Sequence, residues 1–158
     1  RAALIATAQA HDDEMRARIA RHQRERAARV PGLRTLEARH DLPTAIAQAG
    51  GADTLHIVDC LTLWLTQQLM PLEDSGPNRP PAPDWRAQTA LFIEAIRACP
   101  GPIVLVGNEI GLGVIPLGSQ VRAFVDALGV LNQRAAQSCE TVTLMCAGLP
   151  LTLKDESA

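Results

Sequence analysis

The sequence lacks both an excess of charge of either sign and any long apolar run. Its formal net charge at pH 7 is −2, so the chain offers no overall electrostatic attraction to nucleic acid or to an anionic membrane surface. No apolar run approaches the roughly 20 residues of a membrane-spanning helix, and no secretory signal pattern opens the chain. We therefore expect a cytoplasmic protein that binds no nucleic acid and does not insert stably into membranes.

Cysteine is sparse and lacks a pattern. The four cysteines contain no CxxC pair and no regular spacing. This argues against a zinc site built on cysteine pairs and against a disulfide framework, so we expect reduced thiols. They are Cys60, Cys99, Cys139 and Cys146.

Lysine is almost absent, because Lys154 is the only one and the other basic residues are arginines. The sequence also contains no GxxxxGK(S/T) loop, whose backbone amides and lysine hold the phosphates of a nucleoside triphosphate. The chain opens with Arg1 directly before an apolar run. From this opening we expect that residues upstream of Arg1 are missing.

Short aliphatic runs alternate with segments of helical periodicity. Apolar residues make up 47% of the chain and charged residues 20%, as in a globular domain that folds by burial. Near-continuous apolar strands between amphipathic helices predict one α/β domain with a mostly parallel sheet and helices on both faces. The predicted strands are residues 2–7, 55–59, 102–108 and 141–147, with 151–153 as a candidate fifth, and the predicted helices are residues 12–29, 41–49, 61–70, 84–98 and 119–138.

Residues 71–83 contain five prolines, so they cannot continue the preceding helix. We interpret this segment as an exposed loop. Its length resembles that of functional lids, but a proline-rich surface excursion without a partner is the simpler interpretation.

The predicted helix 12–29 places His22 among six arginines. Met15, Ile19 and His22 follow i, i+4, i+7 spacing and therefore share one face. Cationic neighbours favour the neutral imidazole, which is the nucleophilic form, and they would also attract a triphosphate. From these residues alone, a half-buried histidine on a solvated basic helix is the simpler interpretation.

Polar residues follow two of the predicted strands, and ligands of open parallel sheets bind beyond such carboxyl ends. Asp59 ends the strand 55–59, where many phosphate-transfer enzymes hold Mg²⁺, but it could equally cap the next helix. Residues 108–116 contain two glycines, which allow a close approach to a ligand. A lone GxG is also an ordinary turn, and it lacks the third glycine of a Rossmann dehydrogenase.

Taken together, these segments resemble the bifunctional adenosylcobinamide kinase/adenosylcobinamide-phosphate guanylyltransferase family of cobalamin biosynthesis. The resemblance runs in order and almost end to end. Residues 5–8 and 12–22 are similar to the family's IAT…DDEM..RI..H block, residues 33–37 to its WRTxE segment, residues 58–66 to its (D/E)CLTxW(L/V)(T/S)N run, residues 106–116 to its (T/S)NEVGxGIVP run, and residues 131–134 to its VNQ motif.

The resemblance implies a RecA-like P-loop fold, with residues 1–158 forming a single α/β nucleotide-binding domain. It also implies that this domain is truncated before Arg1, so that the first strand and the phosphate-binding loop of the fold are missing. It implies two reactions: phosphorylation of adenosylcobinamide, then transfer of GMP from GTP to adenosylcobinamide phosphate. ATP and GTP would be substrates, Mg²⁺ the cofactor and a homotrimer the assembly. His22 matches the histidine that carries GMP covalently, and Asp59, in place of a common glutamate, would bind Mg²⁺. The residues that match nucleotide contacts are Ala6, Thr7, Ala8, Gln23, Arg24, Glu25, Arg26, Glu37 and Asp59.

Two other interpretations remain open from the sequence. One is a non-catalytic nucleotide-binding relative or subunit that keeps the scaffold without the phosphate loop. The other is an unrelated phosphotransferase with a histidine relay, which would have no affinity for cobinamide compounds.

Overall fold

A computed structural model describes residues 1–38, 41–70 and 84–156. The predicted loop 71–83 lies outside these residues. The chain divides into two compact units, Arg1–Asn108 and Glu109–Ala158, called unit 1 and unit 2 below. No helix among the described residues is long and apolar enough to cross a membrane.

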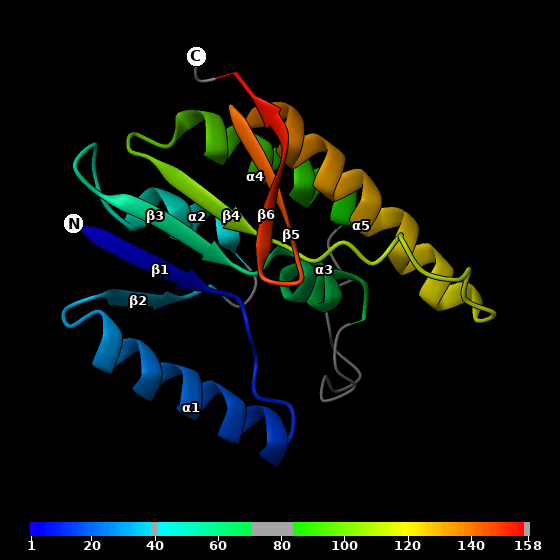
Figure 1. Ribbon diagram of the computed structural model, residues 1–158, viewed down its shortest axis with the longest axis horizontal. Helices are drawn as coiled ribbons and strands as arrows, with labels where there is room; N and C mark the ends of the chain where they lie inside the picture. The colour runs from blue at the N-terminus through cyan, green and yellow to red at the C-terminus, as the bar shows by residue number, and fades with distance from the viewer. Residues whose placement is uncertain (39–40, 71–83, 157–158) are drawn as a thin grey trace. The chain divides into compact units, whose positions relative to one another are not determined.

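Unit 1 is built on a four-stranded parallel sheet with the strand order β2-β1-β3-β4 (Figure 1). The strands are β1 (Ala2–Ala6), β2 (Arg34–Glu37), β3 (Leu55–Asp59) and β4 (Ile103–Val106). The apolar runs predicted as strands at residues 2–7, 55–59 and 102–108 are confirmed, and so is their parallel arrangement. The strand β2 was not predicted, because its short RTLE sequence is mostly exposed and has no apolar run.

The described residues of unit 1 also form four helices: α1 (Asp13–Arg29), α2 (Leu42–Gln48), α3 (Leu61–Leu69) and α4 (Trp85–Ala98). The predicted helix bounds agree with these to within a few residues. The core contains Trp64 and Phe92, both fully buried, with ring centroids 5.3 Å apart. The helix α1 differs from the others because it contains no buried residue.

Unit 2 contains α5 (Ser119–Ser138) and the strands β5 (Thr141–Cys146) and β6 (Leu149–Asp155). The two strands pair antiparallel as a separate sheet, so residues 141–147 do not extend the parallel sheet of unit 1. The reason is the connection between them, in which Ala147 and Gly148 both have positive φ, 51° and 77°. A two-residue turn of this kind joins antiparallel strands, whereas parallel strands need a long crossover.

The only lysine of the chain stabilises the end of α5. Lys154 Nζ donates hydrogen bonds to the carbonyl oxygens of Ala136 (3.3 Å) and Cys139 (2.7 Å), and it pairs with the carboxylate of Glu156 at 3.2 Å. A cation at a helix C-terminus also interacts favourably with the helix dipole. Lys154 therefore has a structural role within unit 2.

Candidate nucleotide site at the carboxyl edge of the sheet

The carboxyl ends of three adjacent strands bring Glu37, Ala6 and Asp59 into one row. Ala6 of β1 is in register with Glu37 of β2 on one side and with Asp59 of β3 on the other. Neighbouring strands lie about 4.8 Å apart, so the Cα atoms of Glu37 and Asp59 are about 10 Å apart, with β1 between them. Both are exposed. Three residues predicted from separate segments therefore meet at the edge where parallel sheets bind ligands.

Asp59 is available for a ligand because it does not cap a helix. The residue at the N-cap of α3 is Cys60, and no side chain makes a capping hydrogen bond there. The alternative prediction of Asp59 as a helix cap is therefore wrong. Within the described residues, no group of three or more His, Cys, Asp or Glu could hold a metal ion. The exposed carboxylate nevertheless suits Mg²⁺, which commonly takes one or two carboxylates plus substrate phosphates and water.

Thr7 directly follows Ala6 and is fully buried. Its hydroxyl donates a hydrogen bond to the Cys60 carbonyl oxygen (2.7 Å) and accepts one from the Cys60 amide (2.8 Å). Its own amide donates to the Asp59 carbonyl oxygen at 3.0 Å. Its carbonyl oxygen accepts a hydrogen bond from the side chain of Gln67. The polar groups of Thr7 are thus used within the fold, where they tie the end of β1 to the end of β3.

Cys60, next to Asp59, is a buried thiol. Burial raises its pKa above the ordinary value, and the nearby Asp59 carboxylate acts in the same direction, although backbone hydrogen bonds oppose both effects. A thiol held in the protonated form is a poor nucleophile. Cys60 is therefore a structural residue of this edge.

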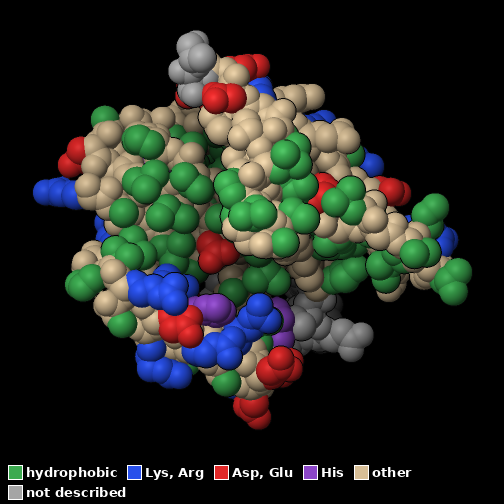
Figure 2. Space-filling view, viewed as in Figure 1, with side chains coloured by type: hydrophobic (Ala, Val, Ile, Leu, Met, Phe, Trp, Pro, Cys, Tyr) green, Lys and Arg blue, Asp and Glu red, His purple; other side chains and the backbone are tan. Residues whose placement is uncertain are grey.

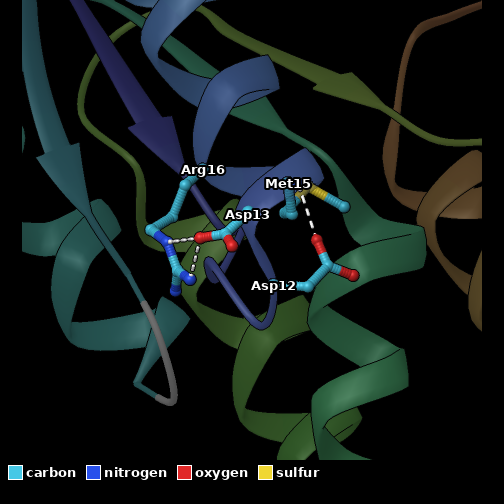
Figure 3. A network of polar contacts seen from close by, with 4 residues as sticks. All are labelled: Asp12, Asp13, Met15 and Arg16. Carbon is cyan, nitrogen blue, oxygen red and sulfur yellow. Dashed lines mark hydrogen bonds and ion pairs between the residues drawn. The ribbon is translucent and has the colours of Figure 1, made fainter.

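The helix α1 begins at a well-formed cap, Asp12, which follows the end of β1 at Ala6 through a short connection. The Asp12 carboxylate accepts a hydrogen bond from the Met15 amide at 2.7 Å, and Asp13 pairs with Arg16 (Figure 3). Such caps satisfy amides that the first helical turn leaves without partners. The acidic residues predicted to open this helix therefore fix its first turn.

His22 lies on a half-buried stripe of α1. Met15, Ile19 and His22 are all intermediate in burial, which confirms their predicted common face. The His22 side chain is 45% exposed, and its Nδ1 lies 3.6 Å from a carboxylate oxygen of Glu25. Among the described residues, Nε2 has no partner. An imidazole that turns Nδ1–H toward a carboxylate presents the lone pair of Nε2 to an incoming group.

The residues after His22 are mostly exposed. Gln23, Arg24 and Glu25 are exposed and Arg26 is half-buried, and Glu25 also lies 4.0 Å from Arg21. Figure 2 shows arginine side chains gathered around histidine on the part of the surface where Figure 1 draws α1. This surface can offset the negative charge of phosphates.

Two of the segments that carry the resemblance meet within unit 2. One carboxylate oxygen of Glu109 accepts from the Gly111 amide (2.7 Å), and the other accepts from the Asn132 side chain (3.4 Å). In unit 1, the amide and the side chain of Asn108 both donate to the Thr62 hydroxyl, at 3.0 and 3.2 Å. Sequence reasoning assigned no role to Thr62 or Gln67, because a polar residue inside an amphipathic helix carries no recognisable signal.

A parallel sheet with carboxylates at its ligand edge and an arginine-rich helix between β1 and β2 defines an α/β protein suited to binding nucleotides. Comparisons with known proteins support this class. The model of the family described as cobinamide kinase / cobinamide phosphate guanyltransferase matches residues 1–153.

Three curated relatives carry matching names. The bifunctional adenosylcobalamin biosynthesis protein CobP of Pseudomonas aeruginosa is 45% identical over 152 residues, which cover 96% of this chain and 82% of the relative. The bifunctional adenosylcobalamin biosynthesis protein CobU of Salmonella typhimurium is 35% identical over 157 residues, and that of Escherichia coli is 32% identical over 159 residues. Each of these two alignments covers 95% of this chain and 84% of the relative.

The chain therefore belongs to the cobinamide kinase / cobinamide phosphate guanyltransferase family. The predicted resemblance is confirmed. By this membership, the chain has cobinamide kinase and cobinamide phosphate guanylyltransferase activities in adenosylcobalamin biosynthesis, and its substrates are cobinamide compounds and nucleotides. The family also implies a P-loop nucleoside triphosphatase fold.

Proposed function

We propose that the guanylyltransferase reaction of this protein runs through a covalent bond between GMP and His22. The observation that carries this proposal is the position of His22: half-exposed on an arginine-rich helix, with Nδ1 against Glu25 and Nε2 without a protein partner among the described residues. In covalent catalysis, a neighbouring side chain commonly orients the nucleophile in this way.

In the first step, His22 Nε2 attacks the α-phosphorus of GTP. A P–N bond forms, the P–O bond to the leaving group breaks, and pyrophosphate departs with that electron pair. In the second step, a phosphate oxygen of adenosylcobinamide phosphate attacks the same phosphorus, the P–N bond breaks, and GMP is transferred. Glu25 stabilises the imidazolium character that develops in the first step, and arginines of α1 offset charge on the phosphates.

The nucleotide would lie along the row at the carboxyl edge of the sheet. Asp59 would hold Mg²⁺ directly or through water, and the bound ion would offset charge on the phosphates of ATP or GTP in both reactions. Glu37 would contact the nucleotide from β2, Ala6 from the end of β1, and Ala8 from the connection after β1, with the buried Thr7 between them in the chain. Gln23, Arg24, Glu25 and Arg26 complete the proposed contacts from α1.

Other features of the proposal rest on the family resemblance. They are the RecA-like form of the fold, one nucleotide-binding domain over residues 1–158, a homotrimer, and a cytoplasmic location. Sedimentation analysis of the purified protein would test the trimer.

The covalent route is tested by comparing the two activities in variants of the enzyme expressed from its complete reading frame. His22→Asn should abolish GMP transfer to adenosylcobinamide phosphate but leave most of the kinase activity, because γ-phosphoryl transfer to an alcohol needs positioning and charge stabilisation rather than a covalent histidine. His11→Asn is the matched control, since His11 is exposed and lies outside α1. It should leave both activities near normal.

Two outcomes would contradict the proposal. GMP transfer that survives in His22→Asn would remove the covalent role, and equal loss of both activities would assign His22 to the shape of a shared nucleotide site. A wild-type protein that lacks both activities would instead support the non-catalytic relative.

A further inference from the structure

The side chain of Gln67 in α3 is buried and uses both ends of its amide on the connection between β1 and α1. Its Nε2 donates to the carbonyl oxygen of Thr7, and its Oε1 accepts a hydrogen bond from Gln9 Nε2 at 3.1 Å. Only 8% of the Gln67 surface is exposed. A primary amide has a donor end and an acceptor end, so one buried side chain holds two points of the connection.

This connection, residues 7–12, determines where α1 begins. Its last residue, Asp12, is the N-cap of α1. The helix contains no buried residue, and its ion pairs, such as His22–Glu25, join residues of the helix itself. Because no residue of α1 is buried, packing contributes little to holding this helix in place. The position of α1 therefore depends on the chain segments that join its two ends.

The same hydrogen-bond network reaches the nucleotide edge. Thr7, which Gln67 holds through its carbonyl oxygen, makes two hydrogen bonds with Cys60 and one with Asp59. Gln67 therefore joins α3, the ends of β1 and β3, and the start of α1 in one network. Because the hydrogen bonds that join Thr7 to Gln67 and Cys60 are buried, loss of one partner leaves a polar group that water does not readily satisfy.

We propose that Gln67 is a positioning residue for guanylyl transfer, which fixes the β1–α1 connection and thereby the placement of His22 relative to the nucleotide edge at Asp59. This inference rests on the proposed covalent role of His22. A nucleophile must come within about 3–3.5 Å of the reacting atom, and a displacement of about 1 Å can cost about 100-fold in rate. The kinase reaction does not use His22 and is therefore less sensitive to the position of α1.

The test compares variants of the enzyme expressed from its complete reading frame. Gln67→Met keeps the length of the side chain but removes both hydrogen-bonding ends, and Gln9→Ala removes the hydrogen bond that Gln67 Oε1 accepts. Gln48→Met makes the same change at an exposed glutamine of α2 and serves as the control. The measurements are the rate of covalent labelling by GTP labelled at the α-phosphate, the kinase rate, and the hydrogen exchange of amides in residues 8–16.

Gln67→Met is expected to slow covalent labelling by about tenfold or more, to lower the kinase rate much less, and to speed amide exchange in the first turn of α1. Gln9→Ala should cause a smaller loss of labelling, and the double variant should be no slower than Gln67→Met alone, because both changes break the same contact. Gln48→Met should behave like the wild type in all three measurements.

Unchanged labelling in Gln67→Met, or a parallel loss of labelling and kinase activity, would overturn the inference. If Gln67→Met does not fold, Gln9→Ala decides: labelling and amide exchange equal to those of the wild type would contradict the positioning role. Absence of labelling in the wild type would contradict the covalent mechanism itself. In that case faster exchange in Gln67→Met would still identify Gln67 as the residue that fixes the connection.

Discussion

The buried hydroxyl of Thr7 should contribute more to stability than its methyl group. Thr7→Val keeps the shape of the side chain but removes the oxygen that donates to the Cys60 carbonyl and accepts from the Cys60 amide. Cys60 is itself buried, so water does not easily replace these two bonds. Thr7→Ser is the matched control, because it keeps the hydroxyl and loses only the methyl group.

The expected sizes of the two effects differ clearly. In Thr7→Val the Cys60 amide would lose its partner, which costs about 1–3 kcal/mol, whereas the Cys60 carbonyl oxygen would still accept a hydrogen bond from the Trp64 amide at 3.2 Å and would lose only about 1 kcal/mol, so the expected total is about 2–4 kcal/mol. Loss of one buried methyl group in Thr7→Ser costs about 1 kcal/mol. Since many domains have unfolding free energies of only about 5–15 kcal/mol, Thr7→Val should be strongly destabilised.

Urea unfolding followed by tryptophan fluorescence measures this difference. The chain has two tryptophans, Trp64 and Trp85, and both lie in unit 1, so the signal reports the unit that contains Thr7. The unfolding free energy should fall further in Thr7→Val than in Thr7→Ser. Equal destabilisation of the two variants would refute the reasoning, because it would mean that the hydroxyl contributes no more to stability than one buried methyl group.

Further predictions concern Asp59, Asp12 and Cys60. Asp59→Asn should lower both activities while leaving the unfolding free energy unchanged, because the side chain is exposed and caps no helix; a destabilised variant with normal activity would show a structural role instead. Asp12→Ala should cost about 1 kcal/mol of helix stability, seen as faster amide exchange at Met15, and unchanged exchange would exclude the cap. Because burial raises the pKa of Cys60, Cys60 should react with iodoacetamide after the exposed Cys146. For the same reason, folding should lose stability as the pH rises above about 8.5, where the unfolded thiol ionises first, and a flat pH dependence would contradict the shift.

The sequence predicted those parts of the fold that depend on local pattern. Continuous apolar runs identified β1, β3 and β4, and helical spacing identified the half-buried face that carries His22. The strand β2 was missed because it is short and exposed, and the separate pairing of β5 depends on a turn with two positive φ angles. Neither feature has an apolar pattern from which it could be predicted.

The candidate site was predictable as a set of residues but not as an arrangement. The sequence identified Glu37 and Asp59 as acidic residues, but only strand register places them on either side of Ala6. It also assigned a nucleotide contact to Thr7, whose polar groups the structure uses within the fold. The role of Gln67 depends on contacts between α3 and the β1–α1 connection, and such long-range contacts leave no mark in the local sequence.

The most direct test of the covalent mechanism is to map the site of labelling. The enzyme expressed from its complete reading frame is incubated with GTP labelled at the α-phosphate, digested under alkaline conditions that preserve a P–N bond, and analysed by peptide mass spectrometry. We predict that acid-labile label is found on the peptide that contains His22, and that no label remains in His22→Ala. Label on a peptide that contains His11 or the fully buried His56, or label retained in His22→Ala, would contradict the proposed role of His22.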